Sequence, residues 1–561
     1  MDNRQPPAAG SVIEEATLPL DSTGVPNLDL VLGGGLLRGS LVSVVGPPGC
    51  GKTTLATQIA FAAAREGRTV LILTTLSEPT SKLLAHLRGY QFYDPELVGE
   101  RVRVLSLQQF LSSGLASAAD EVVALTRGSA ISLVVLDGFS GLRAADPDPQ
   151  AGRQFLFDIG TTLSLQGTTT IITSEAEVRD PGTFPEGTTA DTILGLYFGV
   201  KDERQRRRLE VVKSRGAEPL AGLHGLSIDA GGVAISPRLE ARVVRDTRAR
   251  VPSIAAASGM VDAEPAASSG TGRATFGLPA LDALLGGGIS RATTTLLIGS
   301  GGTGKTLLSL QFALTGVRAG EQVVFLGFHE ERHQLLLKAD AFDLGPALRA
   351  ALDPGGGLTL LHQPPVELEA DAMADRLLAT LDRTGARRLV VDSIAVLERA
   401  VAEGSTAQRV QGYLSALVTA LQARRITALF TKETGPFAGT KLELESDLSS
   451  GVAENVMWLQ ALIYRQRYYR VLSVLKMRYS AHDLALREFT ITAPNGIEVR
   501  VPLKSERSVM AGIALQQGDP LVDSRPRGGS AQVRVRGYRP RGRIDRRSRP
   551  RSGDATPQGE A

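Results

Sequence analysis

The same phosphate-loop pattern occurs twice in this chain, and it constrains the fold more than any other feature. Gly46-Pro-Pro-Gly-Cys-Gly-Lys-Thr53 and Gly299-Ser-Gly-Gly-Thr-Gly-Lys-Thr306 both fit G-x-x-x-x-G-K-T. In such a loop the glycines let consecutive backbone N–H groups curl around a phosphate chain, and the following helix adds its positive N-terminal end. We therefore predict two triphosphate sites, with contacts from Gly46, Gly49, Gly51, Lys52, Thr53, Thr54, Gly299, Gly302, Gly304, Lys305 and Thr306.

Each loop also predicts a magnesium ion. The two loop lysines are expected to reach the outer phosphates, and the hydroxyls of Thr53 and Thr306 are expected to hold Mg²⁺ that bridges those phosphates. Asp137 and Asp392 each end an apolar, strand-like run. Carboxyl ends of buried strands are where such sheets bind ligands, so both aspartates are predicted to hold the magnesium through water.

An internal duplication relates the two loops. Lys305 lies 253 residues after Lys52, and the same offset pairs Leu32-Gly-Gly-Gly35 with Leu285-Gly-Gly-Gly288. After each loop, short apolar runs alternate with helical segments, which indicates a buried parallel sheet wrapped by helices. The predicted fold class is therefore α/β, with two tandem P-loop NTPase domains whose sheets are mainly parallel.

Composition and charge predict the cellular location and the bounds of the remaining segments. No apolar run is long enough to span a membrane and the N-terminus is not signal-like, so we expect a cytoplasmic protein. The window Arg525–Arg551 holds eleven arginines and one acid, whereas the whole chain has a net charge of only +3. The predicted segments are a disordered N-terminus at 1–17, a first domain at 18–245, a linker at 246–272, a second domain at 273–507 and a disordered Arg-rich tail at 508–561.

With these features placed, the chain resembles the KaiC family of double-domain RecA-like ATPases. Late segments of both repeats strengthen the resemblance, Glu203–Gly216 in the first and Val474–Phe489 in the second. The resemblance implies ATP and Mg²⁺ as cofactors and a homohexameric ring with ATP between subunits. It also implies contacts across the subunit interface to the neighbour's nucleotide, from Lys213, Arg215, Lys476, Met477 and Arg478.

The resemblance further implies where the catalytic base lies, because the family has a glutamate pair after the strand that follows the loop helix. The second repeat reads Phe328-His-Glu330-Glu331 and the first reads Thr75-Leu-Ser-Glu78. Glu330 is the expected base with Glu331 in reserve. In the first domain the acidic pair is incomplete, because Glu78 is its one glutamate. This difference from the family pattern puts ATP hydrolysis in the first domain in question.

Family members of this kind also phosphorylate themselves on adjacent Ser/Thr residues ahead of the last nucleotide-contacting segment. The corresponding stretch is Glu445–Gly451, which makes Ser449 and Ser450 the candidate acceptors. A polar turn explains these serines equally well. KaiB-like or other signalling proteins are the partners that the resemblance suggests.

Three other interpretations stay open at this stage. His329–His333 fits the H-E-x-x-H zinc pattern, although it occupies the slot of the ATPase glutamates. The Arg-rich tail and the basic aromatic run Tyr464–Arg470 permit a DNA-dependent ATPase of the recombination type, although the run also fits a hairpin. The incomplete acidic pair permits a scaffold that binds nucleotide to assemble and turns it over slowly.

Overall fold

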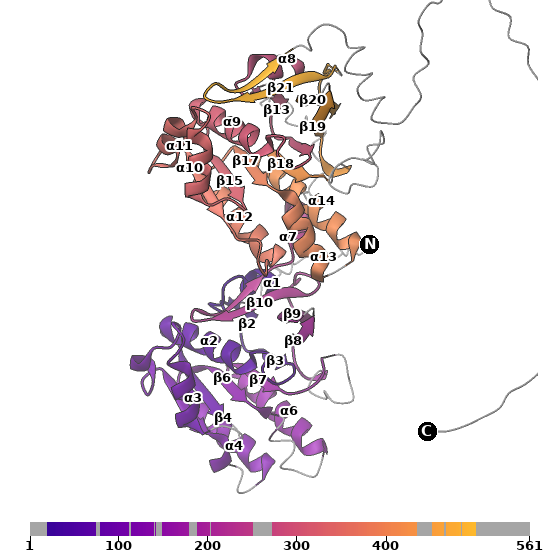
Figure 1. Ribbon diagram of the computed structural model, residues 1–561. Coiled ribbons are helices and arrows are strands. Elements are labelled where there is room, and N and C mark those ends of the chain that lie inside the picture. Colours follow the sequence, from indigo (N-terminus) through magenta and orange to yellow (C-terminus); the bar gives the residue numbers. More distant parts are fainter. Residues whose placement is uncertain are drawn as a thin grey trace, which may run out of the picture.

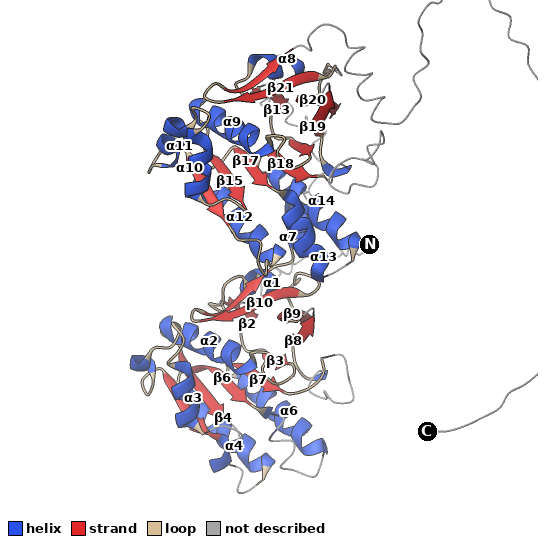
Figure 2. Ribbon diagram, in the orientation of Figure 1, coloured by secondary structure: helices blue, strands red, loops and turns tan. Residues whose placement is uncertain are grey.

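The computed structural model describes residues 19–74, 79–110, 114–139, 141, 149–178, 188–201, 203–250, 272–404, 406–434, 451–464, 467–483 and 485–500. They form two α/β domains, each built around a nine-stranded sheet. Figure 1 shows the two domains following one another along the length of the molecule, and Figure 2 shows helices on both faces of each sheet. Among the helices that these residues form, none combines the length and apolar character of a membrane span.

The first sheet has the order β11-β10-β9-β8-β3-β7-β6-β4-β5. Six neighbouring strands, from β8 to β5, are parallel, and β8 to β11 form an antiparallel edge. The strands are β3 (Leu41–Val45), β4 (Thr69–Thr74), β5 (Val102–Ser106), β6 (Ile131–Asp137), β7 (Thr169–Ser174), β8 (Thr192–Lys201), β9 (Arg204–Ser214), β10 (His224–Asp229) and β11 (Gly232–Ser236). The helices are α1 (Leu28–Leu32), α2 (Lys52–Arg65), α3 (Thr80–Leu87), α4 (Leu115–Thr126) and α6 (Pro149–Leu165).

The second sheet repeats this topology, with the order β16-β15-β17-β18-β14-β19-β20-β21-β22. Its strands are β14 (Thr294–Gly299), β15 (Val323–Gly327), β16 (Leu358–His362), β17 (Arg388–Asp392), β18 (Thr427–Glu433), β19 (Asn455–Tyr464), β20 (Arg467–Met477), β21 (Arg487–Thr492) and β22 (Gly496–Arg500). Its helices are α8 (Pro279–Leu284), α9 (Lys305–Arg318), α10 (Arg332–Asp340), α11 (Gly345–Leu352), α12 (Ala370–Thr384), α13 (Ile394–Gly404) and α14 (Ala407–Ala423). Matching strand orders confirm the predicted fold class. Of the basic aromatic run, Tyr464 ends β19 and residues 467–470 begin β20, the antiparallel partner of β19.

Both faces of each sheet are buried, as the continuous apolar runs predict. In β3, Val42 and Val44 belong to one hydrophobic cluster while Leu41 and Val45 belong to another. Side chains that alternate along a strand point to opposite faces, so helices must cover both. This burial fixes the strands in place and leaves their carboxyl ends to form the sites.

Helix α7 (Leu239–Arg250) connects the domains and packs on the second one. Figure 1 shows it beside α13 and α14, and Leu239 belongs to a core cluster of the second domain. Its Glu240 carboxylate lies 3.2 Å from the Arg409 guanidinium, and Arg242 lies 2.6 Å from Asp375. The predicted domain boundary at residue 245 falls inside this helix.

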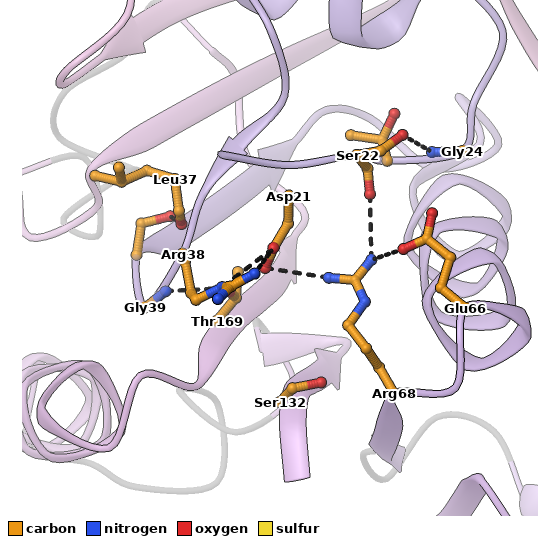
Figure 3. A network of polar contacts seen from close by, with 12 residues as sticks. Asp21, Ser22, Gly24, Leu37, Arg38, Gly39, Glu66, Arg68, Ser132 and Thr169 are labelled. Carbon is orange, nitrogen blue, oxygen red and sulfur yellow. Dashed lines mark hydrogen bonds and ion pairs between the residues drawn. The ribbon is translucent and has the colours of Figure 1, made fainter. Parts of the chain in front are cut away.

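A polar network anchors the start of the first domain (Figure 3). Strands β1 (Leu20–Asp21) and β2 (Leu36–Leu37) form a two-stranded sheet, and the Asp21 carboxylate accepts hydrogen bonds from Arg38 at 2.8 and 3.2 Å. Arg68 lies 3.1 Å from the same carboxylate and 3.0 Å from Glu66. The network therefore ties the short sheet to the turn between α2 and β4. The second domain has its own two-stranded sheet, formed by β12 (Arg273–Ala274) and β13 (Ile289–Ser290).

Candidate functional site

Both predicted phosphate loops lie where a strand passes into a helix, β3 into α2 and β14 into α9. The last loop glycine caps the helix in each domain with a positive φ, 106° at Gly51 and 103° at Gly304. A Cβ on Gly304 would come within 2.4 Å of Ile491, and one on Gly51 within 2.5 Å of Ile228. Only glycine satisfies both requirements, so the loops have the tight path that a phosphate cradle needs.

The loop lysines fold back on their own loops. Lys52 Nζ donates to the Gly46 and Pro47 carbonyls at 2.9 and 3.0 Å, and Lys305 Nζ donates to the Gly299 and Ser300 carbonyls at 2.9 and 2.8 Å. Burial lowers the pKa of Lys305, while the charges of Glu433 and Asp392 oppose that shift. A half-buried ammonium held only by carbonyls is ready to take an anionic phosphate.

The predicted magnesium residues meet in pairs. Thr53 Oγ1 lies 3.0 Å from both carboxylate oxygens of Asp137, and Thr173 donates to the same carboxylate at 2.6 Å. In the second domain Thr431 donates to Asp392, and Asp392 and Thr306 line one cavity. One hydroxyl and one carboxylate are a fitting protein donor set for Mg²⁺, which keeps waters and phosphate oxygens as its other ligands.

The zinc interpretation finds no support in the described residues, among which no cluster of three or more His, Cys, Asp or Glu could hold a metal. His333 Nδ1 instead lies 3.3 Å from Glu331, and both side chains are largely exposed. The H-E-x-x-H match therefore begins in the connection between β15 and α10 and ends in the first turn of α10, rather than lying on one helix.

The second-domain loop opens on a cavity of about 560 Å³. Its lining combines loop glycines with charged side chains from six different elements or their flanking loops. The charged lining residues are Lys305, Glu330, Lys338, Asp392, Arg399, Glu433 and Arg470. The cavity therefore brings together the predicted loop lysine, the predicted base and the predicted metal carboxylate.

The structure distinguishes the two candidate glutamates. Glu331 is the N-cap of α10, where its side chain and that of Gln334 form a capping box. Its carboxylate is thus used for the helix and faces solvent, with 62% of the side chain exposed. Glu330 lines the cavity, is 29% exposed and pairs with Lys338. Only Glu330 of the two is placed beside the phosphate loop.

A second carboxylate per site escaped the sequence analysis. Glu433 lines the second-domain cavity, and a Cβ on Gly301 would lie 2.7 Å from the Oε1 atom of Glu433. In the first domain Glu175 Oε1 lies 3.9 Å from Lys52 Nζ. Both glutamates come two residues after the threonine that bonds the metal aspartate. The Thr-x-Glu pattern could have identified these two glutamates. Its two copies are 258 residues apart rather than 253, so a comparison of the repeats without gaps does not align them.

An arginine from each hairpin also reaches the loop of its own domain. Arg207 of β9 donates to the Gly49 carbonyl at 3.3 and 3.4 Å, and Arg470 of β20 donates to the Gly302 carbonyl at 3.3 Å. These arginines precede Lys213 and Lys476 by the same six residues. Each hairpin therefore contacts the phosphate loop of its own domain through one arginine. The predicted interface residues follow that arginine along the chain.

The predicted interface residues are absent from the linings of the cavities described for this part of the chain. A β-bulge adjoins Lys213 in the β8–β9 hairpin and Lys476 in the β19–β20 hairpin, and bulges re-aim side chains. Lys476 Nζ donates to the Ala453 carbonyl at 2.8 Å, and Arg215 lies 3.2 Å from Asp191. Burial, followed by the charge of the neighbouring arginine, lowers the pKa of both lysines. The linings of the described cavities do not include Lys213, Arg215, Lys476, Met477 or Arg478.

Some predicted residues lie outside the described part of the chain. These are the first-domain glutamate Glu78, the phosphorylation candidates Ser449 and Ser450, and the Arg-rich tail. Their proposed roles stay predictions.

Comparisons with known proteins agree with this geometry. A family model described as "ATPase: KaiC" matches residues 22–240 and 274–504. "Circadian clock protein KaiC3" of Synechocystis sp. is 25% identical over 89% of this chain and 95% of its own length. "Circadian clock oscillator protein KaiC" of Rippkaea orientalis is 26% identical over 87% of this chain and 90% of its own length, and that of Thermostichus vulcanus is 25% identical over 91% and 94%.

The two matched ranges each cover one phosphate loop, one of the strand-end aspartates predicted to hold magnesium, and one late hairpin. Together they account for most of the chain and coincide with the two nine-stranded domains. The chain therefore belongs to the KaiC family of ATPases.

Proposed function

We propose that this ATPase hydrolyses Mg²⁺-ATP chiefly in its second domain, with Glu330 as the general base. The observation that carries the proposal is the single cavity lined by Lys305, Thr306, Glu330 and Asp392. A loop lysine, a metal-binding pair and a carboxylate base are together the set that phosphoryl transfer requires. The proposal is tested by the Glu330→Gln substitution described below.

In this mechanism each residue acts on a defined atom. Lys305 exchanges its loop carbonyls for the outer phosphate oxygens, and Glu330 accepts a proton from the attacking water. Thr306 and Asp392 would hold Mg²⁺, which neutralises charge on the phosphates when bound. The loop N–H groups at the start of α9 stabilise the charge that passes to the leaving ADP.

We further propose a homohexamer in which ATP lies between subunits. The bulged hairpins support it, because Lys213 and Lys476 are absent from the linings of the described cavities while arginines of the same strands contact the loops of their own domains. A neighbour's Lys476 and Arg478 would then complete the charge around the transferring phosphoryl group. The first domain is proposed to bind ATP mainly for assembly, and the names of the relatives suggest clock-type or other signalling partners.

Autophosphorylation on Ser449 or Ser450 is a separate proposal with its own experiment. We expect incubation of the full chain with Mg²⁺ and ATP to add 80 Da per phosphate by intact mass, about the mass of one phosphoryl group, and phosphopeptide mapping to place it on Ser449 or Ser450. A Ser449→Ala/Ser450→Ala double variant serves as the control and should stay unmodified. ATP hydrolysis with no phosphopeptide from this segment contradicts the autokinase and leaves the ATPase standing.

A further inference from the structure

One face of α10 points into the second-domain cavity. Leu335 and Lys338 of α10 are three residues apart on one side of the helix, and both line the cavity together with Phe342, which follows the helix end. The capping box of Glu331 and Gln334 fixes where this helix begins. The place of Lys338 is therefore set by helix register from a fixed start.

Lys338 gives the two carboxylate oxygens of Glu330 different hydrogen-bonding surroundings. Its ammonium bonds Oε1 of Glu330, and the two side chains are 34% and 29% exposed. Oε2 of Glu330 is buried and has no hydrogen-bond partner among the described residues. Since buried polar atoms are normally satisfied, Oε2 calls for a donor beyond the described residues. A water molecule poised to attack ATP is such a donor.

The first domain does not carry this lysine. The 253-residue offset that relates the phosphate loops also relates β4 to β15 and α3 to α10. At that offset Ala85 of α3 corresponds to Lys338. The pairing of a base with a lysine therefore distinguishes the second domain from the first.

We infer that Lys338 is a positioning residue that orients Glu330 for proton abstraction. It holds Oε1, so that Oε2 takes the proton of the attacking water. The water oxygen then forms a bond to the γ-phosphorus, the bond from that phosphorus to the β–γ bridging oxygen breaks, and ADP and phosphate leave. This inference rests on the proposed hydrolysis in the second domain.

A double-mutant cycle on the full chain tests it, with steady-state and single-turnover phosphate release as the measurement. Lys338→Met should lower kcat by about 10- to 100-fold, which is at most the low end of the roughly 10²- to 10⁴-fold contribution of a general base, and leave KM for ATP nearly unchanged. Lys338→Arg, which keeps the cation, should restore most of kcat. In a Glu330→Gln background, Lys338→Met should cause no further loss, because Lys338 acts through the base.

The controls separate this role from a structural one. Arg332→Met removes an exposed cation from the same helix outside the cavity lining and should leave kcat unchanged. Binding of a fluorescent ATP analogue and thermal melting report whether each variant is folded. An unchanged kcat for Lys338→Met, an equal loss in the Glu330→Gln background or a folded but inactive Lys338→Arg would overturn the inference. Full turnover by Glu330→Gln would instead overturn the proposed base.

Discussion

Replacing Glu330 by Gln is expected to reduce ATP turnover by about 10²- to 10⁴-fold, the contribution typical of a general base. Gln keeps the size and polarity of the side chain but cannot accept the proton. Because the rest of the cavity is unchanged, ATP binding should persist. Phosphate release gives the turnover, and equilibrium binding of a fluorescent ATP analogue gives the affinity.

The neighbouring Glu331 provides a matched control. Its carboxylate caps α10 and faces solvent, so Glu331→Gln should cost at most about 1 kcal/mol of helix stability and leave turnover near that of the unmodified chain. Loss of turnover in Glu331→Gln with activity retained in Glu330→Gln would reverse the assignment. A residual rate in Glu330→Gln that Lys52→Ala then removes would show that the first domain also hydrolyses ATP.

The two loop lysines are expected to have different effects. Lys305→Ala should reduce turnover by about 10²-fold or more, as removal of one preorganised cationic or hydrogen-bond donor does at other transition states. Lys52→Ala should chiefly weaken ATP-dependent assembly, because its domain has an incomplete acidic pair in the sequence. Turnover is measured by phosphate release, and assembly by light scattering with size-exclusion chromatography at several ATP concentrations.

An exposed lysine on α3 serves as the control for this comparison, since Lys82→Ala removes the same charge from a side chain that does not line the described cavities. It should change neither turnover nor assembly. Equal loss of turnover in the Lys52→Ala and Lys305→Ala variants would contradict the division of labour between the domains.

The fold could be predicted from the sequence because its signals are local and occur twice. The apolar runs that end at Asp137 and Asp392 are the strands β6 and β17, as predicted. The helices after the loops begin at Lys52 and Lys305, because the preceding glycine caps each helix. A buried parallel sheet leaves little freedom in where such elements lie.

The family resemblance favoured Glu330 as the base, but the sequence alone kept Glu331 in reserve. Glu330 and Glu331 are adjacent, and the difference between them depends on which one caps α10. Which glutamate caps the helix depends on the backbone at the end of β15 and on how far the Gln334 side chain reaches. A gap-free comparison of the two repeats gives neither. Once α10 is placed, the capping residue turns to solvent and its neighbour faces the cavity.

The remaining site residues depend on contacts between distant segments. Arg470 reaches a loop 168 residues earlier in the chain, and Glu433 meets Lys305 only because β18 lies next to β14. Their sequence surroundings are an ordinary hairpin and an ordinary strand end. Tertiary structure, rather than any local pattern, gives these side chains a place in the site.

The most direct test of the account is a structure of the full chain with Mg²⁺, ADP and aluminium fluoride, which imitates the transferring phosphoryl group. We predict that Glu330 lies about 3 Å from a water in line with the aluminium, the reach of a general base. We also predict that Lys476 and Arg478 of a neighbouring subunit contact the fluoride. A water held by Glu331 instead, or a second-domain site completed without a neighbouring subunit, would contradict the account.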